Sequence, residues 1–172
     1  MGGISSKNTQ ANTWRQALAV ETSSADDGST EAPGNAAERG RERTGSHQAI
    51  ILVIDDDRTI RGLLHEALNL RGYHVTAVGT VQEAEDILQQ FGAAALGLVI
   101  TDIQLTTDRQ AREGYMLYQR WRASYPALPF LLISGDPASQ TLPAIRTGAV
   151  HFLPKPFTMS ELLDTVRQLF RQ

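Results

Sequence analysis

Acidic residues that follow two apolar runs are the first candidates for chemistry in this sequence. Asp55, Asp56 and Asp57 come directly after the apolar run 51–54, and Asp102 follows the run 96–101. Consecutive carboxylates repel one another unless a cation binds them, and a hard divalent ion such as Mg²⁺ is the usual partner. The acidic run therefore predicts a magnesium site.

Two further polar side chains also follow apolar runs. Ser134 comes after the run 130–133, and Lys155 comes shortly after the run 150–153. Lys7 is the only other lysine in a chain that otherwise uses arginine, which argues against a generic surface role for Lys155. Phosphoryl transfer needs an anionic nucleophile, a divalent cation and a further positive donor, and a compact ammonium suits phosphate. These residue types together indicate phosphoryl chemistry.

The elements that would position these side chains are strands that alternate with helical patterns. Most of the predicted strands are continuous apolar runs, as expected for parallel strands covered on both faces. They cover residues 50–54, 74–78, 96–101, 130–133 and 150–153. A helical pattern follows each one, which predicts a doubly wound, five-stranded parallel sheet with helices on both faces. Because ligands bind at the carboxyl ends of such strands, we expect the polar residues to converge at one edge.

Local signals place several helix ends. Residues 80–83 and 158–161 have the spacing of capping boxes, and Asp57 fits a helix N-terminus, where a negative charge is favoured. The helical periodicity after residue 81 puts Phe91 on the inward face. A short fourth helix is expected around Pro143, which is tolerated in a first turn.

Composition limits the remaining options. The chain has 172 residues, 41% of them hydrophobic, which is enough for one domain plus excess length. Residues 1–46 are rich in Ser, Thr, Gly, Ala, Asn and Glu and are expected to be a disordered extension, so the domain is placed at 47–172. A net charge of −3 argues against nucleic-acid or anionic-membrane binding, and no apolar run has the length of a membrane span. A cytoplasmic location is expected, and the absence of cysteine excludes disulfides and thiolate chemistry.

Four ordered motifs carry a resemblance to a known family: LVIDDD, LVITD, FLLISG and FLPKPF. Together they resemble the receiver domain of two-component response regulators, of the single-domain, chemotaxis-regulator-like kind with a flavodoxin-like fold. The resemblance implies that Asp102 is the phosphoacceptor. It also implies that Mg²⁺ is held by Asp55, Asp56, Asp102 and the backbone carbonyl of Gln104.

The same resemblance assigns roles to residues of the last two strands. Ser134 and Lys155 match the residues that hold the transferred phosphoryl group, and Ser134 and Phe152 match the switch positions. The implied donor is a histidine kinase or a histidine phosphotransfer protein, and the implied product is an aspartyl phosphate on the domain itself. Such a domain is a switch and not an enzyme that turns over an external substrate. Output is expected through protein contact with an unidentified target, and homodimerisation stays open.

The stretch between Asp102 and Gly114 departs from the family pattern, because it is longer than usual. It adds Arg109 and Arg112 close in sequence to a residue that would receive an anion. We hypothesise that these arginines contribute to donor recognition or to the lifetime of the acyl phosphate.

Two other functions compete with this interpretation. Residues 55–59 satisfy the D-x-D-x-T nucleophile pattern of haloacid-dehalogenase-like phosphatases, with Asp55 as the nucleophile. That family needs a further acidic pair after the lysine, whereas only Glu161 and Asp164 follow Lys155, and Asp102 is left without a role. The second alternative is a receiver-like interaction module that is not phosphorylated.

Overall fold

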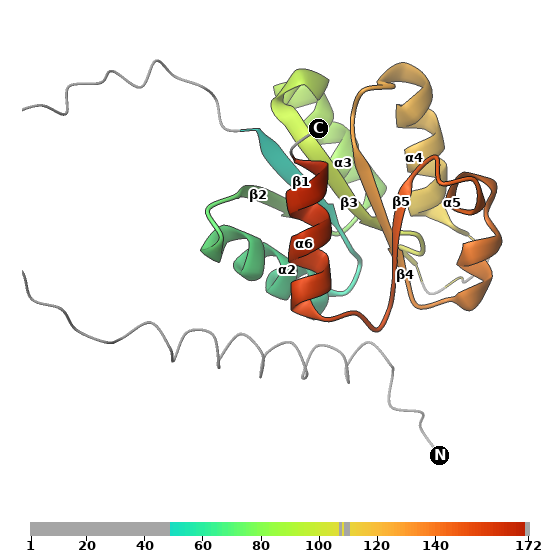
Figure 1. Ribbon diagram of the computed structural model, residues 1–172. Coiled ribbons are helices and arrows are strands. Elements are labelled where there is room, and N and C mark those ends of the chain that lie inside the picture. The colour runs from blue at the N-terminus through green and yellow to red at the C-terminus, as the bar shows by residue number, and fades with distance from the viewer. Residues whose placement is uncertain (1–48, 107, 109–110, 171–172) are drawn as a thin grey trace, which may run out of the picture.

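A computed structural model describes residues 49–106, 108 and 111–170 (Figure 1). The predicted disordered extension at 1–46 and the predicted role of Arg109 lie outside the described residues. The fold and the sites below refer to the described part of the chain.

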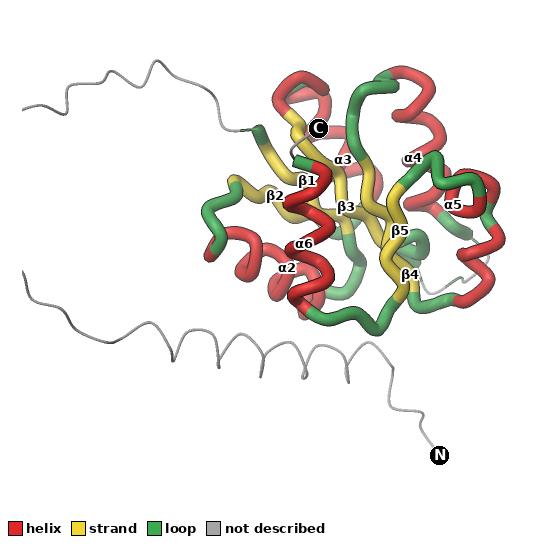
Figure 2. The backbone as a smooth tube through the Cα atoms, in the orientation of Figure 1, coloured by secondary structure: helices red, strands yellow, loops and turns green. Residues whose placement is uncertain are grey.

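A parallel sheet of five strands forms the centre of the domain (Figure 2). The strands are β1 (Ile50–Ile54), β2 (His74–Val78), β3 (Leu96–Asp102), β4 (Phe130–Ser134) and β5 (His151–Pro154). Their order in the sheet is β2-β1-β3-β4-β5, and every neighbouring pair is parallel. β1 and β4 are buried along their whole length, which explains their continuous apolar sequences.

Helices cover both faces of the sheet (Figure 1). They are α2 (Arg58–Leu70), α3 (Val81–Phe91), α4 (Glu113–Ser124), α5 (Pro143–Arg146) and α6 (Met159–Leu169). Because successive strand residues point to opposite faces, Ile51 and Val53 pack with α2 and α6, whereas Leu52 and Ile54 pack with α3 and α4. The predicted doubly wound architecture is confirmed.

The predicted helix starts are also confirmed. Asp57 is the N-cap of α2, and its carboxylate accepts hydrogen bonds from Thr59 N at 2.8 Å and Ile60 N at 3.3 Å. Thr80 and Thr158 open α3 and α6 with complete capping boxes.

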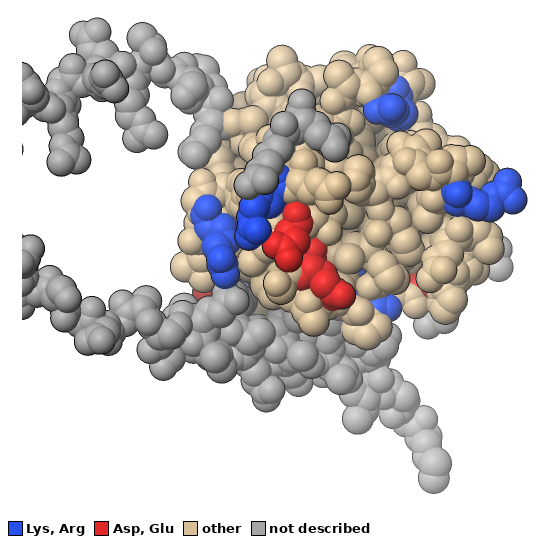
Figure 3. All heavy atoms as spheres, in the orientation of Figure 1, with Lys and Arg blue, Asp and Glu red and all other residues tan. Residues whose placement is uncertain are grey.

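Figure 3 shows acidic side chains gathered over α6 on the face turned to the viewer.

Two predicted details need correction. Phe91 does not face inward but is 47% exposed, because it is the last residue of α3 and the chain turns away at Gly92, whose φ is 77°. The third and fourth strands each run one residue further than predicted, to Asp102 and Ser134, and the fifth covers 151–154 and not 150–153, although Val150 is buried. These differences leave the polar residues at the carboxyl edge of the sheet. Within the described residues, no helix combines the length and the apolar character needed to span a membrane.

Candidate functional site

Three carboxylates meet where β1 and β3 end side by side. Asp55 and Asp102 are buried, with 0% and 2% of their surfaces exposed, and Asp56 is the most exposed of the three. One oxygen from each of these residues lies within 4.8 Å of the others. The structure therefore brings together the acidic residues that the sequence predicted to converge.

Lys155 reaches this cluster from the end of β5. Its Nζ lies 2.7 Å from Asp102 Oδ2 and 3.1 Å from Asp55 Oδ2. The three side chains are only 6%, 3% and 0% exposed, so the ammonium and both carboxylates are largely shielded from water. At this burial the charges interact much more strongly than they would on the surface.

Burial and charge act on the protonation of this cluster in opposite directions. Burial raises the pKa of Asp55 above its ordinary value, although Lys155 and the amide of Asp57 oppose the shift. Burial lowers the pKa of Lys155, but the carboxylates of Asp55 and Asp102 outweigh it, so the pKa is raised overall. Lys155 is therefore cationic at neutral pH.

The donor set fits a hard divalent cation. It consists of carboxylate oxygens, and three carboxylates beside a single ammonium leave an excess of negative charge. Mg²⁺ prefers oxygen ligands and is bound through one or two carboxylates together with water and phosphate oxygens. The chemistry of Asp55, Asp56 and Asp102 thus matches the predicted magnesium site.

Gln104 lies at the rim of the cluster. Its backbone N–H donates to Asp102 Oδ1 at 2.9 Å, which fixes one oxygen of that carboxylate. Its side-chain amide donates to Asp136 Oδ2 at 3.3 Å and so bridges the loops that follow β3 and β4. The backbone of Gln104 is therefore held directly beside Asp102.

Ser134 ends β4 at the same edge of the sheet and is 1% exposed. Its carbonyl accepts a hydrogen bond from Lys155 N at 2.8 Å, which ties the ends of β4 and β5 together. Phe152, in β5, is paired in register with Leu132 and packs, half-buried, against the core on the α3 and α4 side. The structure thus places Ser134 next to Lys155 at the site, and Phe152 further back along β5.

The long stretch after Asp102 returns to the site at its far end. Arg112 has a left-handed backbone with φ of 32° and directly precedes α4. Gly114, in the first turn of α4, donates from its N–H to the carbonyl of Ile103 at 3.1 Å. A Cβ at Gly114 would lie 1.8 Å from the carbonyl oxygen of Asp102, so only glycine fits there. Glycine permits this close approach because it has no side chain.

Sequence reasoning missed three residues that support the site. They are Gly114, Ser139, whose hydroxyl lies 3.0 Å from Ser134 Oγ, and Arg61, whose Nη1 donates to the carbonyl of Asp55 at 2.7 Å. A glycine at the end of the lengthened stretch was a usable signal. The hydrogen-bond partners of Ser139 and Arg61 depend on how loops meet in space, so no local sequence pattern predicts these contacts.

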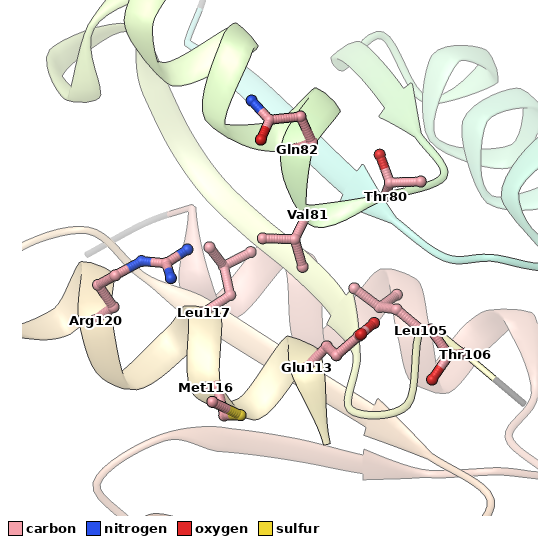
Figure 4. Close-up of a pocket in the computed structure, with 9 residues that line it drawn as sticks. All are labelled: Thr80, Val81, Gln82, Leu105, Thr106, Glu113, Met116, Leu117 and Arg120. Carbon is pink, nitrogen blue, oxygen red and sulfur yellow. The ribbon is translucent and has the colours of Figure 1, made fainter. Parts of the chain in front are cut away.

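A pocket of about 400 Å³ lies between the start of α3, the loop after β3 and α4 (Figure 4). Its apolar lining comes from Val81, Leu105, Met116 and Leu117. Leu105 and Thr106 belong to the loop that follows Asp102, but the lining contains none of the three carboxylates.

A flavodoxin-like sheet that carries an acidic cluster and a buried lysine at its carboxyl edge defines the receiver class of signalling domain. Comparison with protein families agrees, because the response regulator receiver domain matches residues 51–167. The chain belongs to this family.

Individual relatives support the assignment. The transcriptional regulatory protein PmrA of Pectobacterium parmentieri is 32% identical over 123 residues, which make up 71% of this chain and 52% of PmrA. The response regulator protein FleR of Pseudomonas aeruginosa is 34% identical over 119 residues, 69% of this chain and 24% of FleR. The crystal structure of the receiver domain of NtrX from Brucella abortus is 30% identical, with a TM-score of 0.61, and the match covers 71% of this chain and 98% of that domain. The chain thus spans about half or less of the curated relatives named here.

Proposed function

We propose that this chain is a phosphoacceptor switch in which Asp102 receives a phosphoryl group from a phosphohistidine. The donor is a histidine kinase or a histidine phosphotransfer protein. A carboxylate oxygen of Asp102 attacks phosphorus, the phosphorus–nitrogen bond breaks, and its electron pair leaves with the imidazole. The product is an acyl phosphate on Asp102, and the proposal makes the chain a switch that turns over no external substrate.

The observation that carries this proposal is the position of Lys155 between two carboxylates. Its Nζ contacts Oδ2 of both Asp102 and Asp55, so a cation already stands beside the oxygens where further negative charge would arrive. Donors fixed in a water-poor site stabilise developing charge without having to reorganise. After transfer, the ammonium of Lys155 would contact the phosphoryl oxygens. Ser134, at the neighbouring strand end, would donate a hydrogen bond from its hydroxyl to the phosphoryl group.

Asp55, Asp56, Asp102 and the backbone carbonyl of Gln104 would hold Mg²⁺ in this proposal. The bound ion would neutralise phosphoryl oxygen charge and orient the group for attack. The protein's own part is to keep the carboxylates fixed. The hydrogen bonds from Asp57 N to Asp55 and from Gln104 N to Asp102, both 2.9 Å long, do this.

Output in this proposal is a change in protein contacts. Ser134 would donate a hydrogen bond from its hydroxyl to the phosphoryl group and Phe152 would repack in β5, which alters the surface next to α5. The relatives include a transcriptional regulatory protein and the sensor kinase CckA of Brucella abortus, which is 28% identical over 89% of this chain. In this proposal the upstream partner is the phosphohistidine donor, and the downstream partner is an unidentified protein.

The test is covalent labelling of the full chain with acetyl phosphate and Mg²⁺, followed by intact mass measurement. The wild type should gain the mass of one phosphoryl group, and Asp102→Asn should gain none. Asp57→Asn is the matched control, because Asp57 caps α2 and asparagine caps equally well. This variant should label like the wild type.

Two results would contradict the proposal. No added mass on the wild type would favour a receiver-like module that is not phosphorylated. Turnover of an aryl phosphate that is lost in Asp55→Asn but kept in Asp102→Asn would show a phosphatase with Asp55 as its nucleophile.

A further inference from the structure

Ser139 is a buried hydroxyl residue next to the site for which neither the sequence motifs nor the proposed reaction provides a role. It lies in the short 3-10 helix Pro137–Thr141 after β4 and is 1% exposed. We infer that Ser139 is a positioning residue, which fixes the hydroxyl of Ser134 so that its hydrogen points toward the phosphoryl group on Asp102. This inference rests on the proposed function and deepens it.

Two hydrogen-bond donors lie close to the side-chain oxygen of Ser134. Asp136 N donates to Ser134 Oγ at 3.1 Å, and Ser139 Oγ lies 3.0 Å from the same atom. A serine hydroxyl has one hydrogen to donate and two lone pairs to accept. When both lone pairs are used, the hydrogen of Ser134 has one remaining direction, away from these two donors.

Position relative to the site decides which serine donates, because both are 1% exposed and either arrangement leaves one buried hydroxyl hydrogen unpaired before a phosphoryl group arrives. Ser134 Oγ is the only side-chain partner of Ser139 Oγ within the described part of the chain. If Ser134 were the donor, the hydrogen of Ser139 would be buried without an acceptor, at a free-energy cost. With Ser139 as the donor, the unpaired hydrogen belongs to Ser134, which ends its strand at the site and meets an acceptor when a phosphoryl group arrives.

The other donor to Ser134 is held in place as well. The carboxylate of Asp136 accepts from Ala138 N at 3.0 Å and from Gln104 Nε2 at 3.3 Å. The amide that donates to Ser134 therefore belongs to a residue that is tied to the loop next to Asp102. Polar groups that are fixed before reaction stabilise transition-state charge more effectively than groups that must first reorient.

The experiment measures two properties of the full chain in the presence of Mg²⁺. The first is the equilibrium affinity for beryllium fluoride, a stable phosphoryl mimic, which ¹⁹F NMR measures. The second is the rate of labelling by acetyl phosphate. Ser139→Ala should lower both the affinity for beryllium fluoride and the labelling rate by roughly threefold to tenfold, the equivalent of one lost hydrogen bond. Ser139→Cys, which keeps a weak donor of similar size, should fall between Ser139→Ala and the wild type.

Thr141→Ala is the matched control. Thr141 lies in the same 3-10 helix, and its hydroxyl donates to the carbonyl of Ala138 at 2.7 Å without contacting Ser134. Removing this hydroxyl should leave both properties at the wild-type level. An equal loss in Thr141→Ala would show that any weakening of this helix has the same effect, and would overturn the inference.

A double variant separates positioning from a structural role. Ser134→Ala should lower both properties, and Ser134→Ala/Ser139→Ala should lower them no further, because Ser139 acts through Ser134. If Ser139→Ala causes the same fold loss with and without Ser134, or only lowers stability to urea, Ser139 is structural and the inference is wrong. A wild type that neither binds the mimic nor becomes labelled would instead overturn the proposed function, and this inference with it.

Discussion

Lys155 Nζ lies 2.7 Å from Asp102 Oδ2, and the same atom lies 3.1 Å from Asp55 Oδ2, so one ammonium joins the ends of three strands. In the absence of a metal ion, this ammonium is the main compensation for two buried carboxylates. The contact therefore contributes to folding as well as to the proposed chemistry.

Replacing Lys155 by glutamine should destabilise the metal-free protein by about 3 kcal/mol, because removing one partner leaves buried charge without compensation. Mg²⁺ should then raise the free energy of unfolding more in the variant than in the wild type, since the ion compensates the same carboxylates. Urea unfolding with and without Mg²⁺ measures both effects. As a control, Arg167→Gln breaks a pair with Asp164 whose side chains are 51% and 64% exposed, and should cost less than about 1 kcal/mol.

Gly114→Ala should destabilise the domain by about 1–3 kcal/mol or more, because its Cβ would overlap the carbonyl oxygen of Asp102. The displaced backbone should also weaken Mg²⁺ binding, which titration calorimetry measures.

Gly62→Ala is the opposite case. Gly62 lies inside α2, and apart from the helix backbone no atom lies within 4 Å of the place that a methyl group would take there. Alanine at this position should therefore stabilise the protein by about 0.5–1 kcal/mol. Equal effects at the two glycines would refute the steric argument.

Asp57 should be separable from the other two carboxylates of the acidic run. Asp57→Ala removes the N-cap of α2 and should lower the free energy of unfolding by about 1 kcal/mol, whereas Asp57→Asn should change it little. Both variants should keep the Mg²⁺ affinity of the wild type, within the small effect of one nearby charge. A large loss of Mg²⁺ affinity in Asp57→Asn would show that Asp57 is a ligand.

The capping box of α6 should make stability depend on pH. The hydrogen bond from Thr158 N, 2.7 Å long, is the main reason that the pKa of Glu161 lies below its ordinary value of 4.5. A lowered pKa in the folded state gives a stabilisation that is present above the ordinary value and is lost as the pH falls through the folded-state pKa. The advantage of the wild type over Glu161→Gln in urea unfolding should therefore shrink on acidification. An advantage that stays constant from neutral to acidic pH would contradict this assignment.

The features that could be predicted from sequence are those set by local chemistry. The apolar runs of β1 and β4 predicted buried parallel strands. Capping-box spacing predicted the helix starts at Thr80 and Thr158, and a negative charge predicted the one at Asp57. The meeting of Asp55, Asp102 and Lys155 followed from a general rule, because the carboxyl ends of parallel strands share one edge.

The features that escaped prediction depend on distances between loops. Ser139 looks like an ordinary turn residue until the 3-10 helix brings its hydroxyl to Ser134. Phe91 has the helical spacing of a core residue, but it is the last residue of α3 and the chain turns away at Gly92, so the side chain is exposed. Gly114 was visible as a glycine, yet its contact with the carbonyl of Asp102 is a tertiary property.

The hydrogen bond from Gly114 N to the carbonyl of Ile103 closes the lengthened stretch at its base. The segment between Ile103 and Gly114 therefore begins and ends at nearly the same point. The entropic cost of closing such a segment rises only slowly with its length. Leu105 is 5% exposed and packs in the core, so it holds the start of this segment in place. Residues can therefore be added beyond Thr106 while Asp102 keeps its position, and that part of the chain is a natural place to graft a recognition sequence or a reporter without rebuilding the acceptor site.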